Sequence, residues 1–174
     1  MAKKNDFTAG LQVVKVRLVK EEPLFKDRVV RCADDAVAVM ADELAEYDRE
    51  VFCVLNLRTD GSVINMNIVS MGSLSSSAAG PREVFKSSIL SNAAGIILIH
   101  NHPSGHTTPS QADYSVTKQL YDCGKLLDIP VMDHIIISGE HRSENYSFLE
   151  HGELGKSYAE IYANQKNERK GEAR

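Results

Sequence analysis

The chain has 174 residues, of which 20 are basic and 24 acidic, so its formal net charge at pH 7 is −4. This length fits one domain, and 43% hydrophobic with 25% charged residues is a globular rather than a disordered composition. The mild acidity counts against general phosphate neutralisation of nucleic acid, and the sequence predicts neither a membrane span nor a secretory signal.

The first half of the chain predicts a strand, a helix and a hairpin. Alternating apolar residues indicate a half-buried strand at 13–19, and helical spacing of apolar residues indicates an amphipathic helix at about 33–48. Two apolar runs, 51–57 and 62–70, flank the tripeptide Thr-Asp-Gly at 59–61. An Asp-Gly pair between two apolar runs is typical of a β-hairpin.

The second half alternates helices with continuous apolar runs, in the order helix 81–92, strand 95–100, helix 110–126 and strand 129–138. Pro81 suits the first turn of the first of these helices, whose apolar face would carry Phe85 and Ile89. Continuous apolar runs indicate strands covered on both faces. We therefore predict an α/β fold, a mixed β-sheet flanked by helices. A last amphipathic helix from about Leu154 and a frayed tail would complete the chain.

The three cysteines Cys32, Cys53 and Cys123 lie far apart, and none belongs to a Cys-x-x-Cys pair. This spacing excludes a redox dithiol motif and a zinc ribbon. Each cysteine lies among apolar residues, which predicts three buried thiols. Free thiols are typical of a reducing compartment, so the expected location is cytoplasmic.

The densest polar cluster, His100-Asn101-His102-Pro103, closes the most apolar of the predicted strands. Side chains two residues apart on a strand point to the same side, so His100 and His102 can converge on one ion. Imidazole nitrogens suit zinc, and a carboxylate can complete a three-ligand site that leaves one position open. Asp113, at the start of the next helix, would supply that carboxylate.

Simpler interpretations of the same residues remain. Ser110 and Asp113 alone predict a capping box at a helix N-terminus, and the two histidines alone could be hydrogen-bonded residues at a strand end. The metal interpretation is favoured by their combination with a short connection that contains Pro and Gly. His134, on a predicted buried strand, is expected to be a hydrogen-bonded core residue, and His106 an exposed loop residue.

Other hydrolase signatures are absent from the sequence. It contains no His-x-Glu followed by Pro-Cys-x-x-Cys, as zinc deaminases require, and no helical His-Glu-x-x-His of metalloproteases. It also has no Gly-x-Ser-x-Gly of serine hydrolases. The string His-Asn-His is unlike an HNH nuclease, in which the three residues are dispersed over a ββα element.

The spacing of His100-x-His102, seven residues and then Ser110-x-x-Asp113 resembles the JAMM motif of the JAB1/MPN metalloprotease superfamily. The surrounding segments, PREVF at 81–85, IILIHNHPSG at 96–105 and LDIPVMDH at 127–134, resemble its bacterial RadC branch. The resemblance covers about residues 30–150. It implies a cytidine-deaminase-like fold and a zinc ion (Zn²⁺) held by the two histidines and Asp113 in a metallopeptidase-type site.

The resemblance also implies an upstream catalytic glutamate, and Glu50 fits best because it lies between the first helix and the strand at 51–57. Cys53 stands where the family's Glu-x-x-Gly has glycine. Glu83 is the rival, on a helix that resembles RadC-specific sequence. Glu50 would accept the proton of a metal-activated water and deliver it to the leaving amine, and Ser110 would hydrogen-bond the oxyanion.

The implied function is a zinc-dependent metallopeptidase or isopeptidase acting on a peptide or an isopeptide-linked protein. The competing hypothesis is a metal-braced binding module without catalysis, acting in DNA repair or on a protein partner. RadC proteins usually carry a helix-hairpin-helix segment before this domain, which we expect to be missing here, so nucleic acid is not favoured as a partner. The expected division is a lead-in at 1–29, the RadC-like domain at 30–150, and a C-terminal helix and basic tail at 151–174.

Overall fold

The computed structural model describes Leu18 and residues 29–44, 47–72, 79–139, 141 and 144–161. Three helices and five strands lie wholly within these residues, in the order α1 (Ala33–Leu44), β1 (Val51–Leu57), β2 (Val63–Met71), α2 (Pro81–Leu90), β3 (Gly95–His102), α3 (Gln111–Leu127), β4 (Val131–Ser138) and β5 (Asn145–Ser147). Within the described part of the chain, no helix combines the length and the apolar character that crossing a membrane requires.

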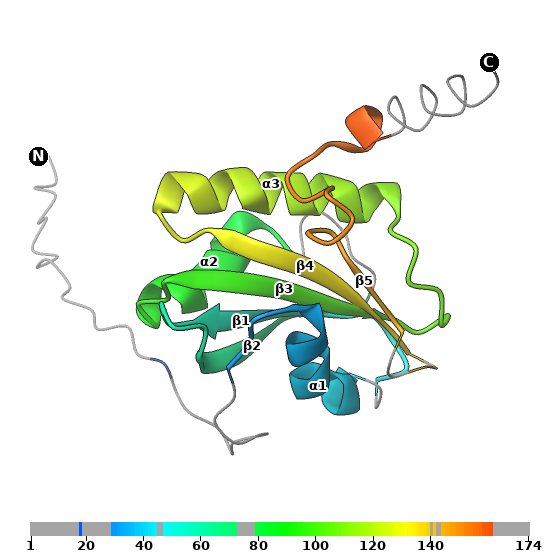
Figure 1. Cartoon of the computed structure of the whole chain (residues 1–174), viewed down its shortest axis with the longest axis horizontal. Coiled ribbons are helices and arrows are strands. Elements are labelled where there is room, and N and C mark those ends of the chain that lie inside the picture. Colours follow the sequence, from blue (N-terminus) through cyan, green and yellow to red (C-terminus); the bar gives the residue numbers. More distant parts are fainter. Residues whose placement is uncertain are drawn as a thin grey trace, which may run out of the picture.

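The five strands form one mixed sheet in the order β2-β1-β3-β4-β5 (Figure 1). The hairpin strands β1 and β2 are antiparallel, as are β1 and β3, whereas β3 and β4 are parallel. A parallel pair needs a long crossover connection, and α3 provides it. The predicted mixed α/β sheet with flanking helices is confirmed.

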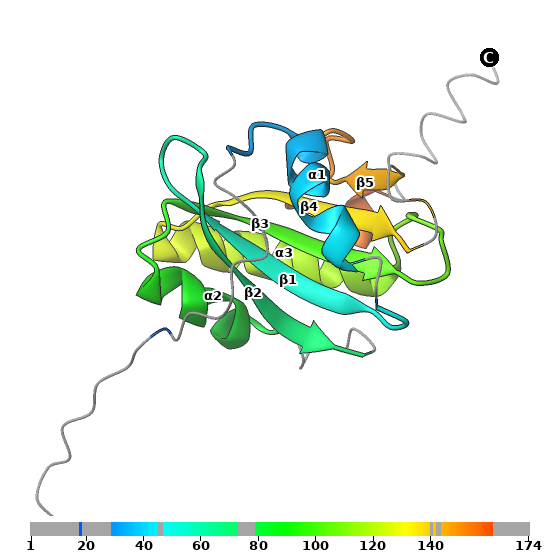
Figure 2. The same ribbon diagram turned by 90° about the horizontal axis from the view of Figure 1, so that it is seen from below.

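Helices cover both faces of the sheet, α1 on one side and α2 with α3 on the other (Figures 1 and 2). Alternate residues of β3 therefore enter different cores: Ile97 and Ile99 pack with α1, whereas Ile96 and Leu98 pack with α2 and α3. Covering both faces explains why the central strands are apolar without interruption. It also means that every polar side chain near the end of β3 must find a partner.

Most element boundaries agree with the sequence prediction, but some differ. Helix α1 ends at Leu44, and Tyr47 lies beyond its last turn. On α2, Phe85 is buried as predicted but Ile89 is 53% exposed, so the expected apolar pairing of these two residues is wrong. Strand β5 was not predicted, because three residues are too few for a periodic pattern.

Two predicted segments fall at the ends of the chain. The strand at 13–19 lies outside the described residues apart from Leu18, and the tail at 166–174 lies outside them altogether. The last helix begins at Tyr158 and is described as far as Ile161, while Leu154 lies in the turn before it.

The prediction of three buried cysteines is correct for Cys53, holds only in part for Cys123, which is half-buried, and is wrong for Cys32, which is exposed. Cys32 directly precedes the first residue of α1, and its side chain is exposed although Val30 and Ala33 on either side of it are buried. Cys53 is fully covered in β1, and burial raises the pKa of its thiol to about 12. Because the thiolate is the reactive form, the Cys53 side chain is chemically inert in the folded protein.

This difference predicts selective alkylation. We expect iodoacetamide to modify Cys32 in the folded protein, whereas Cys53 should react only after denaturation. Peptide mass spectrometry at increasing reaction times measures the order. The Cys32→Ser variant is the control, since it should remove the fast site and leave Cys53 protected. Equal modification rates for both thiols in folded protein would contradict the buried position of Cys53.

Candidate metal centre

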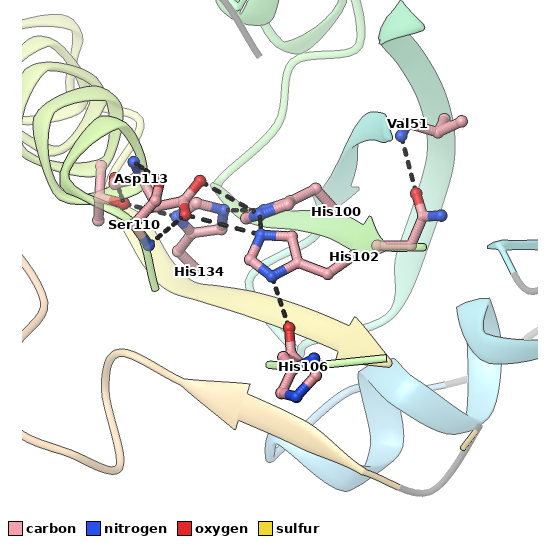
Figure 3. A network of polar contacts seen from close by, with 9 residues as sticks. Val51, His100, His102, His106, Ser110, Asp113 and His134 are labelled. Carbon is pink, nitrogen blue, oxygen red and sulfur yellow. Dashed lines mark hydrogen bonds and ion pairs between the residues drawn. The ribbon is translucent and has the colours of Figure 1, made fainter. Parts of the chain in front are cut away.

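His100 and His102 point from the end of β3 toward α3, on the side of the sheet opposite α1 (Figure 3). Their Nε2 atoms lie 3.0 Å apart. His100 is fully buried and His102 is partly exposed. The strand continues through His102, two residues farther than predicted, because β3 pairs with β4 as far as Ser138. The alternation of side chains along this strand brings the two imidazoles together.

Asp113 reaches the same point from the first turn of α3. One carboxylate oxygen lies 3.3 Å from Nε2 of His100, and the other lies 3.7 Å from Nε2 of His102. The donor atoms of these three side chains all lie within 4.8 Å of one another, so the group could hold a metal ion. Burial acts to raise the pKa of Asp113, but the neighbouring His100 and His102 imidazoles outweigh it and hold the pKa far below its usual range.

The predicted capping box is confirmed, and it uses the same carboxylate. Ser110 is the N-cap of α3: its hydroxyl oxygen accepts the Asp113 N–H at 3.2 Å, and its own N–H donates to the Asp113 carboxylate at 2.6 Å. The helix cap and the metal group are therefore not alternatives. The cap fixes the rotamer that presents the Asp113 carboxylate to the histidines.

Backbone geometry fixes the tautomer of His102. Gly105 has a positive φ of 81°, a left-handed conformation that glycine adopts without strain. The turn brings the carbonyl of His106 to 2.7 Å from Nδ1 of His102 (Figure 3). A carbonyl only accepts hydrogen bonds, so Nδ1 of His102 carries a hydrogen, and in the neutral imidazole Nε2 keeps its lone pair. The His106 side chain is exposed, as predicted.

Negative charges beside the two histidines oppose the effect of burial on their pKa values. Burial lowers the pKa of His100, although the negative charges of Asp113 and Glu50 oppose that effect. At His102 burial also acts to lower the pKa, but the Asp113 carboxylate and the His106 carbonyl outweigh it, and the pKa is raised. The Glu50 charge contributes at both imidazoles. The two carboxylates therefore act in favour of positive charge at the centre, although at His100 burial outweighs them.

Of the two candidate glutamates, Glu50 is the one whose charge acts on the histidines. It directly precedes β1, is partly buried, and its carbonyl accepts the Gly72 N–H at 2.8 Å. Glu83 instead pairs with Lys86 at 2.9 Å and with Arg82 at 3.2 Å on α2. Those cations lower the pKa of the Glu83 carboxyl, which is unlike a proton-accepting group poised near neutrality.

Asn101, between the two histidines, points to the opposite face of β3 and holds the backbone on both sides of Glu50. Its Oδ1 accepts the Val51 N–H at 2.7 Å (Figure 3), and its Nδ2 donates to the Arg49 carbonyl at 3.0 Å. Asn101 is fully buried. One side chain thus ties the segment that carries Glu50 to the strand that carries the histidines.

The Asn101→Ala variant is therefore expected to be destabilised. Each buried backbone group left without a partner costs about 1–3 kcal/mol of the free energy of unfolding. Urea denaturation followed by circular dichroism measures the loss. Gln119→Ala, which removes an exposed amide side chain from α3, is the control and should change the free energy by no more than about 0.5 kcal/mol. Equal stability of the two variants would contradict the role of Asn101.

The prediction that His134 is a hydrogen-bonded core residue is confirmed, but it omitted the contact with the metal group. His134 is fully buried on β4, and its Nε2 lies 2.8 Å from Nδ1 of His100. Its Nδ1 lies 2.5 Å from Oγ1 of Thr117. Thr117 follows Asp113 by four residues on α3, a helical spacing that places both side chains on one face. The spacing of four residues from Asp113 is therefore the feature of the sequence that could have placed Thr117 near the site.

The donor set suits zinc. Two imidazole nitrogens and one carboxylate oxygen converge, and three protein ligands with a fourth position left open are typical of catalytic zinc sites. The Nδ1 atoms of His100 and His102 both have partners on the side away from the group, as imidazole ligands of metals almost always do.

Comparisons with known proteins agree on one family. The family model described as "RadC-like JAB domain" matches residues 30–153. A "UPF0758 protein" of Moorella thermoacetica is 50% identical over 109 residues, covering 63% of this chain and 48% of that protein. A "UPF0758 protein" of Desulfitobacterium hafniense is 42% identical over 141 residues, covering 81% of this chain and 61% of that protein. The chain thus spans about half to three fifths of the length of these curated relatives.

Proposed function

The chain belongs to the RadC-like JAB domain family, and from that premise we propose that it is a zinc-dependent metallopeptidase or isopeptidase. The observation that carries the proposal is the convergence of the donor atoms of His100, His102 and Asp113 within 4.8 Å. The proposed substrate class is a peptide or an isopeptide-linked protein, because a metal-activated water can attack an amide carbonyl. Three free thiols fit a cytoplasmic location.

His100, His102 and Asp113 would hold the ion. When bound, zinc supplies an activated water at neutral pH and polarises a carbonyl group. The chain's own residues supply the proton transfers. In the proposed reaction the Glu50 carboxylate accepts a proton from the attacking water and returns it to the nitrogen of the leaving amine. The negative charge of Glu50 already acts on the histidine pair, which supports this role.

Ser110 would stabilise the oxyanion that develops when the amide carbonyl is attacked. Its hydroxyl oxygen accepts the Asp113 N–H, and in the proposed reaction its hydrogen turns from the Asp113 carboxylate to the oxyanion. Ser110 is exposed and stands at the N-terminus of α3, where the helix dipole favours negative charge. Removing a single oxyanion donor typically costs about 10²–10³ in kcat.

A cleavage assay tests the proposal. Zinc-loaded protein would be incubated with a peptide library and with an isopeptide-linked protein conjugate, and the products analysed by mass spectrometry. We expect cleavage that a chelator abolishes and that added zinc restores. Loaded protein that binds zinc yet cleaves neither substrate would favour the metal-braced binding module. For the DNA-binding form of that alternative, a gel shift at low salt decides, because phosphate contacts are strongest there.

A further inference from the structure

A second layer of buried side chains lies behind the metal group. His134 from β4 and Thr117 from α3 are both fully buried, and neither belongs to the group that could hold the ion. The His134 ring stacks on Phe148 with 4.9 Å between the ring centres and meets the edge of Phe52 at 5.5 Å. Its orientation is therefore fixed by packing as well as by hydrogen bonds.

The positions of the hydrogens in this layer follow from the backbone carbonyl of Asp113, which can only accept a hydrogen bond. The Thr117 hydroxyl has a single hydrogen and lies 2.5 Å from the backbone carbonyl of Asp113. A carbonyl has no hydrogen to share, so the Thr117 hydroxyl must donate to it. Oγ1 of Thr117 then accepts in its other contact, and the hydrogen in that contact belongs to Nδ1 of His134.

The same reasoning assigns the ring hydrogen of His100. A neutral imidazole with its hydrogen on Nδ1 carries a lone pair on Nε2. Nε2 of His134 therefore accepts from Nδ1 of His100, at 2.8 Å. His100 is left with its own lone pair on Nε2, the atom that lies 3.3 Å from the Asp113 carboxylate and faces His102. This series of hydrogen bonds begins at the backbone carbonyl of Asp113 and ends at His100, beside the carboxylate of the same aspartate.

We propose that Thr117 and His134 are positioning residues that select the Nδ1-protonated tautomer of His100 and so present its Nε2 lone pair to a divalent cation. The inference rests on the proposed function in that it takes the His100, His102 and Asp113 group as the cation site. The opposite tautomer would place a hydrogen on Nε2 and block the ligand atom. Outer partners of metal-bound histidines commonly act in this way.

Thr117→Val tests the proposal with little change of shape, because it replaces the hydroxyl with a methyl group and leaves Nδ1 of His134 without its acceptor. We expect zinc affinity, measured by competition with a chromophoric chelator, to fall about 10–100-fold. Thr117→Ser restores the oxygen and should bind zinc nearly as tightly as the wild type. Wild-type affinity in folded Thr117→Val protein would overturn the proposal.

A second measurement needs no zinc. Long-range ¹H–¹⁵N correlation spectra of the metal-free wild-type chain report which ring nitrogen carries the hydrogen. We expect His100 and His134 both to be protonated on Nδ1, and the Thr117→Val spectrum to show His134 shifted toward the other tautomer. A hydrogen on Nε2 of neutral His100 in the wild type would overturn the inference. If the wild type binds no zinc, the proposed function fails, while these spectra still decide the tautomer.

Discussion

Protein reconstituted with zinc and freed of excess metal is expected to hold zinc in stoichiometric amount, and the His100→Ala variant is expected to hold none. The variant leaves one imidazole and one carboxylate, fewer than the three protein ligands of a catalytic zinc site. The loss of affinity should exceed the roughly 10–100-fold that removal of an outer partner costs. Elemental analysis of the desalted protein measures the zinc content directly.

The matched control is His106→Ala. The His106 side chain is exposed, and its contribution to the centre is a backbone carbonyl that the variant keeps. It should therefore hold as much zinc as the wild type. If the His100→Ala and His106→Ala variants retained equal amounts of zinc, the ion would be bound elsewhere and the proposed centre would be wrong.

The second large effect is expected at Glu50. Glu50→Gln keeps the size of the side chain and removes its ability to accept a proton, so zinc should remain while the hydrolysis rate falls about 10²–10⁴-fold. Elemental analysis and the peptide cleavage assay, carried out on the same preparation, separate the two effects. Loss of zinc together with activity would instead show that Glu50 acts on the ion and not on the proton.

Glu83→Gln is the control for this experiment, because Glu83 was the rival on sequence grounds. Its carboxylate pairs with Lys86 and Arg82, so its removal should leave both zinc content and hydrolysis unchanged. A variant at Glu83 that lost hydrolysis while the Glu50 variant kept it would reverse the proposed assignment of the two glutamates.

Local patterns were sufficient to predict the parts of the molecule that depend on neighbouring residues. The apolar run at 51–57 has the boundaries of β1, and the Ser-x-x-Asp spacing gives the cap of α3. The convergence of His100 and His102 followed from the two-residue period of a strand. In each case the signal and the structure lie within a few residues of each other.

The second layer of the site depends on contacts between distant segments. His134 comes beside the centre because β4 pairs in parallel with β3, with His134 opposite Leu98. The clamp of Asn101 on the backbone at 49–51 joins residues fifty positions apart, through the antiparallel pairing of β1 and β3. A single sequence holds no local signal for such pairings, so these partners became visible only in the folded chain.

The side chain of Asn101 lies on the opposite face of β3 from those of His100 and His102, and this arrangement bears on the register of the strand. A slip of β3 by one residue would turn Asn101 toward α3 and both histidines toward α1, because each residue changes face. The convergence of the two histidines with Asp113 and the clamp on the Glu50 segment would be lost in the same event. The polar His-Asn-His tripeptide thus fixes the register of β3. The apolar residues that precede it in the strand are covered on both faces and would tolerate a shift by one residue.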